Sequence, residues 1–366
     1  VLLTLIYLAI GPLMAIPRTA ATSFSVGILP LAGDGTLQLA VYTALYFALA
    51  WWLSITPSKL LSRIGKILTP LFAVMIVALF VLGLSAFTTT ELTAPAGNYA
   101  ISAFGSGFIE GYNTVDTIAA FAFCIIALQT LRQMGFSSQR EYYISVWAAG
   151  ASVAILMAAL YLGLGLLGNH FPIPESVYQN PAVNLGAYVL TQASYSVFGP
   201  VGVWFLAVMV AITCFTTSVG LIAAVSEFFA SEFPRLSYKA YVTIITLFSF
   251  AAANLGLNQI IQVTLPLLLF VYPMAITVVL LIIVNKFVSL SRIGMRLAVA
   301  AAAVCAVIDI LHQFAHLEMA GQMLSYLPLG TSGLGWIVPV GVAIALSFIL
   351  PEKVTGSVDV AEDLHG

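Results

Sequence analysis

The sequence predicts an all-α integral membrane protein built from long apolar helices. Of its 366 residues, 61% are hydrophobic and only 7% are charged, whereas a soluble domain carries about 25% charged residues. The mean hydropathy of +1.07 agrees with this class. Apolar stretches of about 20 residues, long enough to span a bilayer, recur along the chain. The lipid bilayer is therefore the expected environment. The net charge of −2 gives no reason to expect nucleic acid as a partner.

Ten membrane spans are predicted, and the fourth of them is broken near its middle. Their approximate limits are 1–28, 37–55, 66–87, 99–134, 143–168, 199–230, 238–254, 258–285, 296–312 and 333–350. A short surface helix is expected at 181–197, in the long loop before the sixth span. We therefore interpret residues 1–350 as a single transmembrane domain and residues 351–366 as a short acidic tail.

The start of the chain lies inside a hydrophobic stretch. Val1 is followed directly by apolar residues, and no Met or basic leader precedes it. A signal peptide would begin with a positively charged segment. We therefore expect that the sequence lacks the N-terminus of a longer protein.

The basic residues predict the orientation of the spans. Eleven of the twelve fall in alternate loops or in the tail: Lys59, Arg63, Lys66, Arg132, Arg140, Arg235, Lys239, Lys286, Arg292, Arg296 and Lys353. The remaining loops contain no Lys or Arg; they are 29–36, 88–98, 169–198, 255–257 and 313–332. Because cytoplasmic loops carry the excess of Lys and Arg, the basic side and the C-terminus are predicted to be cytoplasmic.

The first span contains Gly11-Pro12 and Pro17-Arg18. Proline removes a backbone donor and bends a helix, so this span is expected to be kinked. A charged side chain at membrane depth is rare and marks Arg18 as a candidate functional residue. The alternatives are a structural ion pair, for example with Glu110, or a side chain that extends to the outer interface.

The fourth span is interrupted by the run Phe104-Gly-Ser-Gly-Phe-Ile-Glu-Gly-Tyr-Asn-Thr-Val-Asp116. Its two acids, Glu110 and Asp116, would each cost about 2.5–3.5 kcal/mol at the bilayer centre, so the run should face protein or water. We predict two half-helices that meet at 105–114, with the second beginning near Asp116. Its exposed N–H groups would favour a substrate carboxylate. The alternative is a glycine-rich helix that packs tightly, with Asp116 serving only as a cap.

The sixth span contains several adjacent hydroxyl side chains in the run Thr213-Cys-Phe-Thr-Thr-Ser-Val-Gly220. Hydroxyl oxygens at membrane depth can be ligands for a weakly held cation. The alternative is structural, because Ser and Thr in membrane helices often bond to the carbonyl four residues earlier.

Other chemistry has little support in the sequence. Asp309, His312 and His316 share a helical face, but polar residues also emerge into water at the end of a span, so a metal site is not expected. No zinc-protease motif, phosphate-binding loop or nucleophile elbow occurs in the chain. We therefore expect that the protein is not an enzyme.

Several motifs in order along the chain resemble the bacterial branched-chain amino acid:cation symporters, the LIVCS family. The run Gly11-Pro-Leu-Met-Ala-Ile-Pro-Arg-Thr-Ala-Ala-Thr-Ser-Phe-Ser-Val-Gly27 is similar to the signature of the third helix in that family. The supporting motifs are Gly107-Phe-Ile-Glu-Gly-Tyr-Asn-Thr-Val-Asp116, Thr216-Thr-Ser-Val-Gly220, Glu227-Phe-Phe, Asn254-Leu-Gly-Leu, Ile308-Asp309 and Leu327-Pro-Leu.

The resemblance implies a leucine-transporter-type fold, a five-plus-five inverted repeat, with twelve spans in the complete protein. The ten spans predicted here would then be helices three to twelve. Members of the family import leucine, isoleucine and valine together with Na⁺ or H⁺ across the bacterial inner (plasma) membrane. The alternatives are a transporter of the same fold for other amino acids or small solutes, or a passive channel.

The resemblance also implies roles for particular residues. Those matching the unwound part of the sixth family helix, which holds substrate, are Phe108, Gly111, Tyr112, Asn113 and Thr114. Phe104 is expected to join Phe108 and Tyr112 in an apolar pocket for the aliphatic side chain. For Na⁺, the expected ligands are the hydroxyls of Thr216 and Thr217, with the carbonyl of Thr213 nearby. No cofactor other than the coupling ion is expected, and no ligand role transfers to Arg18.

Overall fold

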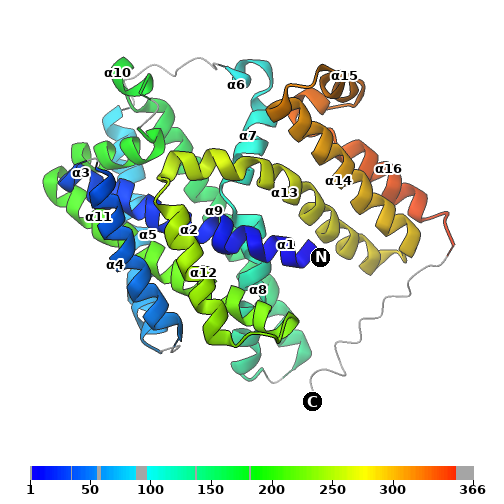
Figure 1. Ribbon diagram of the computed structural model, residues 1–366, viewed down its shortest axis with the longest axis horizontal. Helices are drawn as coiled ribbons and strands as arrows, with labels where there is room; N and C mark the ends of the chain where they lie inside the picture. Colours follow the sequence, from blue (N-terminus) through cyan, green and yellow to red (C-terminus); the bar gives the residue numbers. More distant parts are fainter. Residues whose placement is uncertain are drawn as a thin grey trace. The chain divides into compact units, whose positions relative to one another are not determined.

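The computed structural model describes residues 2–33, 35–55, 59–87, 97–136, 138–180 and 183–351, and these form helices joined by short connections (Figure 1). The helices are α1 (Leu2–Leu8), η1 (Ala9–Leu13), α2 (Ala15–Ser23), η2 (Phe24–Ile28), α3 (Leu29–Ala32), α4 (Thr36–Ile55), α5 (Lys59–Phe87), α6 (Asn98–Ile101), α7 (Ala103–Asn113), α8 (Asp116–Gln133), α9 (Gln139–His170), α10 (Glu175–Tyr178), α11 (Leu185–Glu232), α12 (Tyr238–Ala253), α13 (Leu257–Phe287), α14 (Arg292–Ala315), α15 (Glu318–Tyr326), η3 (Gly330–Ser332) and α16 (Ile337–Ser347).

Contacts group the chain into two compact units. The first unit consists of Val1–Ile6, Pro95–Ile118 and Leu265–Gly366, and the second of Tyr7–Ala94 and Ala119–Thr264. The predicted single transmembrane domain over 1–350 stays a prediction. The predicted tail lies outside the described residues beyond Pro351.

The second unit is organised around α11. This helix has 48 residues and is the longest in the described part of the chain. It contacts α2, η2, α4, α5 and α12. One of its buried clusters joins α11 to η2 and α5 through Val26, Met75, Ile76, Leu206 and Val210. Because other helices cover α11 on several sides, some polar side chains of this helix, such as Ser218 and Ser226, are buried, whereas Thr217 is exposed.

A sharp kink divides α11 at Gly199. Its backbone angles are φ +66° and ψ −159°, a region that only glycine occupies readily. Pro200 follows and lacks the N–H that would continue the helix. The part of α11 that precedes Gly199 matches the predicted short helix at 181–197. The prediction that it lies on the surface is wrong for one face, because Ala193 and Ser194 are buried.

The first unit contains a close pair of helices, α14 and α16, which run side by side (Figure 1). Gly294 permits this approach, since a Cβ at that position would lie 2.3 Å from the Cβ of Ser347. Hydrogen bonds hold the same ends together: the Ser291 amide donates to Ser347 Oγ at 2.7 Å, and Ser291 Oγ donates to the Pro351 carbonyl at 2.6 Å.

Short polar side chains begin several of the helices. Ser102, Ser138, Asn184 and Ser237 each accept a hydrogen bond from the backbone amide three residues later. Such caps satisfy donors that have no partner within the helix. They explain why these helices begin where a polar residue interrupts an otherwise apolar sequence.

Each predicted span overlaps a helix of the structure. In the described part of the chain, six stretches are long and apolar enough to cross a membrane: Leu2–Ile28, Thr36–Ile55, Gln139–His170, Leu185–Glu232, Leu257–Phe287 and Arg292–Ala315. Shorter apolar helices occupy Pro70–Ala86, Tyr238–Ala253 and Ile337–Ser347. The count of ten spans and the inverted repeat stay predictions. Helix α15 was not predicted, because its nine residues lie in a stretch treated as a loop.

Candidate functional site

The predicted substrate residues lie on α7 and on the connection that follows it. Phe104, Phe108, Gly111, Tyr112 and Asn113 are helical, and Thr114 follows the last residue of α7. The two half-helices therefore meet only at the end of the predicted run 105–114, and the implied unwinding is wrong for Phe108 and Gly111–Asn113. Gly105 explains part of the difference: a Cβ there would lie 2.6 Å from the Cβ of Ser332, so this glycine permits close packing.

The helix break itself is confirmed, and it is narrow. It consists of Thr114 and Val115, after which α8 begins at Asp116 as predicted. Val115 has φ of +67°, a conformation that is strained for a β-branched residue. Thr114 Oγ1 donates to the Gly111 carbonyl at 2.8 Å, which closes the end of α7. The end of α7 and the start of α8 thus lie two residues apart.

Aromatic rings form a row along α7. The ring centroids of Phe104 and Phe108 lie 6.1 Å apart, and those of Phe108 and Tyr112 lie 5.6 Å apart. Tyr112 then stacks on Tyr272 of α13, with centroids 4.3 Å apart and planes 22° from parallel. Phe104 is 76% exposed, whereas Tyr112 is only 3% exposed. The row therefore changes from exposed to buried toward the helix break.

Tyr112 lines a small cavity of the first unit. Asp309, Cys305 and Trp336 line the same cavity. The hydroxyl faces the Trp336 indole, yet neither Tyr112 Oη nor Trp336 Nε1 has a partner of ordinary hydrogen-bond geometry among the described residues. Sequence reasoning missed Asp309 as a neighbour of Tyr112, because the two are far apart in the chain and only the fold brings them together.

The two carboxylates of the interrupted span occupy different local environments. Glu110 accepts a hydrogen bond from the Asn113 side-chain amide at 2.9 Å. Asp116 lies in the first turn of α8, where the helix dipole favours a negative charge. This position supports the structural alternative for Asp116, because the carboxylate stabilises the helix start without any ligand.

Arg18 lies on α2, in the kinked first span. Gly11 has non-helical angles (φ −79°, ψ −122°), so the predicted bend at Gly11-Pro12 is confirmed. The Arg18 side chain is half-buried. Arg18 and Glu110 belong to different units, so an ion pair between them stays one of the open alternatives for Arg18.

The predicted sodium ligands lie next to one another on α11. Thr216 Oγ1 and Thr217 Oγ1 both donate to the Thr213 carbonyl, at 3.0 and 2.9 Å. Thr213 Oγ1 donates in turn to the Met209 carbonyl at 2.8 Å. The structural alternative predicts such bonds from threonine hydroxyls to backbone carbonyls of the same helix. They use the hydroxyl protons and leave oxygen lone pairs available, so they are compatible with cation binding.

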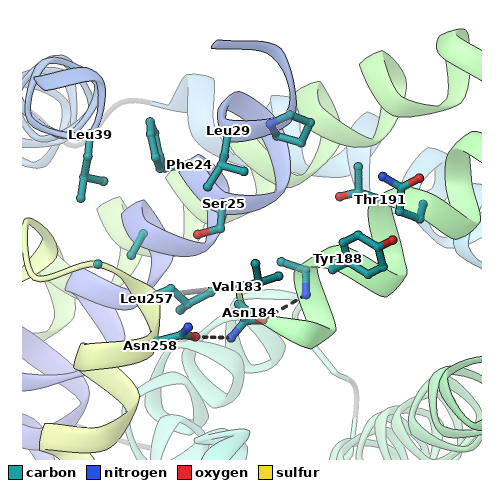
Figure 2. A pocket seen from close by; sticks show the side chains of 15 residues that line it. Phe24, Ser25, Leu29, Leu39, Val183, Asn184, Tyr188, Thr191, Leu257 and Asn258 are labelled. Carbon is teal, nitrogen blue, oxygen red and sulfur yellow. Dashed lines mark hydrogen bonds between the residues drawn. The ribbon is translucent and has the colours of Figure 1, made fainter. Parts of the chain in front are cut away.

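A separate pocket of about 340 Å³ lies in the second unit (Figure 2). Its walls come from the end of the first span, the start of α4 and the N-terminal parts of α11 and α13. Asn184 Nδ2 donates to Asn258 Oδ1 at 2.9 Å, and Asn184 also caps α11. None of the predicted substrate or sodium residues lines this pocket, as far as the described part of the chain extends.

These features define a class of protein. Helices long and apolar enough to cross a membrane, together with a broken helix bearing aromatic and polar side chains, are typical of a membrane carrier.

Comparisons with known proteins identify the family. A family model described as branched-chain amino acid transport protein matches residues 1–354. A protein of Staphylococcus aureus named as a branched-chain amino acid carrier is 37% identical over 357 residues, which cover 95% of this chain and 79% of that protein. A protein of Staphylococcus haemolyticus with the same description is 36% identical over 364 residues, covering 97% and 80%. The chain belongs to the branched-chain amino acid transport protein family, a family of transporters rather than enzymes.

Proposed function

We propose that the protein imports leucine, isoleucine and valine by symport with Na⁺ or, in second place, with H⁺. The observation that carries this proposal is the two-residue break between α7 and α8, next to a row of aromatic rings, in a chain of this family. A break of this kind presents backbone groups that a free amino acid can bond within the membrane. The proposed location is the bacterial plasma membrane, with the C-terminus in the cytoplasm.

The substrate would bind at the end of α7. Its carboxylate would face the N-terminus of α8, whose first N–H groups have no helical partner. Its aliphatic side chain would lie against Phe104, Phe108 and Tyr112. Gly111, Asn113 and Thr114 supply backbone and side-chain polar groups at the same helix end. An apolar pocket distinguishes one methylene by only about 1–3 kcal/mol, so the three branched-chain amino acids should compete.

The coupling cation would bind on α11. Thr216 and Thr217 supply hydroxyl oxygens. Thr213 supplies a backbone carbonyl, which would exchange a hydroxyl hydrogen bond for the cation, because it accepts both hydroxyl protons in this structure. Carbonyl and hydroxyl oxygens at membrane depth are ligands that Na⁺ accepts in secondary transporters. Arg18, Glu110 and Asp116 remain candidates for a part in the transport cycle, since each places a charge on a membrane helix or at its break.

Uptake of labelled leucine into proteoliposomes tests the substrate. Unlabelled isoleucine and valine should each reduce uptake strongly. Lysine and glutamate should not, because the proposed pocket for the substrate side chain is aromatic and offers no partner for a charged group. A protein that conducts leucine only down its own gradient would be a passive channel, the second candidate. Equal competition by all four unlabelled amino acids would contradict the proposed specificity.

A further inference from the structure

An open groove runs between α13 and α14 in the first unit. It encloses about 760 Å³. Its apolar walls are formed by Leu281 and Ile282 of α13 and by Met295, Val299 and Ala303 of α14. Ile282 is 65% exposed, so this part of the apolar lining is open, whereas Leu281 is only 4% exposed.

Two arginines stand at one end of this groove. Arg292 and Arg296 lie one helical turn apart at the start of α14, and both are exposed and line the groove. No acidic residue lines it in the described part of the chain. The sequence contains no Asp or Glu between Glu232 and Asp309, so neither arginine has an acid nearby along the chain. Among the described residues, the groove therefore combines positive charge with an apolar wall.

The position of the arginines matches the depth of lipid headgroups. Helix α14 is one of the stretches long and apolar enough to cross a membrane, and the arginines lie in its first turns. They share the basic side of the predicted topology, where anionic lipids attract Lys and Arg. From Arg292 to Ala303 the helix rises roughly 16 Å at 1.5 Å per residue, about half of the ~30 Å hydrocarbon thickness.

We propose that the groove between α13 and α14 binds an anionic phospholipid, with its phosphate held by Arg292 and Arg296. One acyl chain would lie along the apolar wall toward Ala303. Guanidinium groups form paired hydrogen bonds to phosphate, and basic pockets between membrane helices on the cytoplasmic side are typical binding sites for acidic headgroups. This site is independent of the proposed substrate and cation residues, none of which lines the groove.

A competing occupant is the acidic end of the chain. Ser291 Oγ donates to the Pro351 carbonyl, so residues 352–366 continue from a point next to Arg292. That segment carries four acidic residues, Glu352, Asp359, Glu362 and Asp363. Its five apolar residues are interspersed with polar residues and glycine, and no more than two of them are consecutive. It matches the charge of the arginines and not the apolar wall, and for this reason we favour the lipid.

Native mass spectrometry of the purified full chain tests the proposal. The protein is titrated with dioleoyl phosphatidylglycerol and, in parallel, with dioleoyl phosphatidylcholine. We expect phosphatidylglycerol to bind roughly tenfold or more tightly, because each basic residue near an anionic lipid adds about one kcal/mol of attraction. The double substitution R292Q/R296Q should abolish this preference. Equal binding of the two lipids by the unchanged protein would overturn the proposal.

Matched variants distinguish loss of the lipid site from a general effect of charge and from misfolding. R235Q/K239Q removes two charges from another predicted cytoplasmic loop and should leave the preference intact. R292K/R296K keeps the charge and should keep most of the preference. Ala300→Trp fills the groove without touching the arginines and should weaken phosphatidylglycerol binding, whereas Val304→Trp, on an exposed position outside the groove, should not. The opposite result with either tryptophan variant would contradict an acyl chain in the groove.

Two further arms distinguish other sources of negative charge. Millimolar inorganic phosphate should not displace the lipid; if it did, the site would be a simple anion site. A chain ending at Pro351 should bind phosphatidylglycerol as the full chain does. If only the shortened chain bound it, the acidic tail would be the occupant, and the lipid proposal would be wrong.

Discussion

Val115 is the residue where the helix break is most evident. Its φ of +67° is unfavourable for a β-branched side chain, yet the residue is buried, with 6% of its surface exposed. Strain of about 1–3 kcal/mol persists only where the surrounding structure holds it. The fold therefore maintains the break between α7 and α8 at a cost in free energy, which is the behaviour expected at a functional site.

Tyr112 offers the most direct test of the substrate site at the level of one residue. Tyr112→Phe keeps the ring that stacks on Tyr272 and removes only the buried hydroxyl. If that hydroxyl bonds the substrate, its loss should raise the KM for leucine about tenfold, since a hydrogen bond contributes about 1 kcal/mol or somewhat more. Tyr326→Phe, at a residue that is 88% exposed, is the control. An unchanged KM in Tyr112→Phe would exclude the hydroxyl from substrate binding.

Thr217 tests the cation site in the same way. Thr217→Ala removes one proposed ligand oxygen and should raise the half-saturating Na⁺ concentration about tenfold, with little change in the maximal rate. Ser231→Ala is a matched control, because Ser231 lies on the same helix, is exposed and also donates to a nearby backbone carbonyl. Transport assays at increasing Na⁺ measure both. The same Na⁺ dependence in Thr217→Ala and in the control would count against the α11 site.

Residue chemistry also shows how far the sequence can predict the site. The polar run was visible because acids and Asn are costly in a membrane, and α8 begins at Asp116 as expected. The resemblance implies more unwinding than the structure has, because α7 stays helical through the glycines of this run. Glycine within a helix costs only about 1 kcal/mol, and Gly105 is used for packing against Ser332. Such a contact between distant segments cannot be deduced from local sequence.

At the level of elements, the pair α14 and α16 depends on one glycine. Gly294→Ala would place a Cβ 2.6 Å from the Cα of Ser347, so the helices would have to separate. We expect a loss of about 1–3 kcal/mol of stability, the usual cost of overpacking. Gly341→Ala, on α16 itself, is the control, because nothing lies within 4 Å of the added Cβ. Thermal unfolding in detergent compares them; equal midpoints would show that this contact does not limit stability.

Helix positions were predicted better than helix details. Long apolar stretches have few alternatives in a membrane, because every backbone group must be bonded internally. The kink at Gly199 could be suspected from Gly199-Pro200, but the burial of Ala193 and Ser194 depends on packing against other helices. Helix α15 was missed, since its short length falls below any membrane-spanning pattern.

At the level of the whole molecule, symport requires that cation and substrate binding be linked. A cation that raises the affinity for leucine must itself bind more tightly when leucine is present, by the same factor. The sequence leaves the ion open for a physical reason. Threonine oxygens can bind Na⁺ but do not take up a proton at neutral pH, whereas Glu110, Asp116 and Asp309 are carboxylates that could carry one.

The most direct test of the account is accumulation of labelled leucine in proteoliposomes under imposed ion gradients. We predict that an inward Na⁺ gradient drives leucine to a several-fold higher internal concentration than equal Na⁺ on both sides, and that a Na⁺ ionophore abolishes the difference. Accumulation driven by an inward proton gradient alone would identify H⁺ as the coupling ion. Leucine uptake that responds to neither gradient would contradict symport, and with it the central claim.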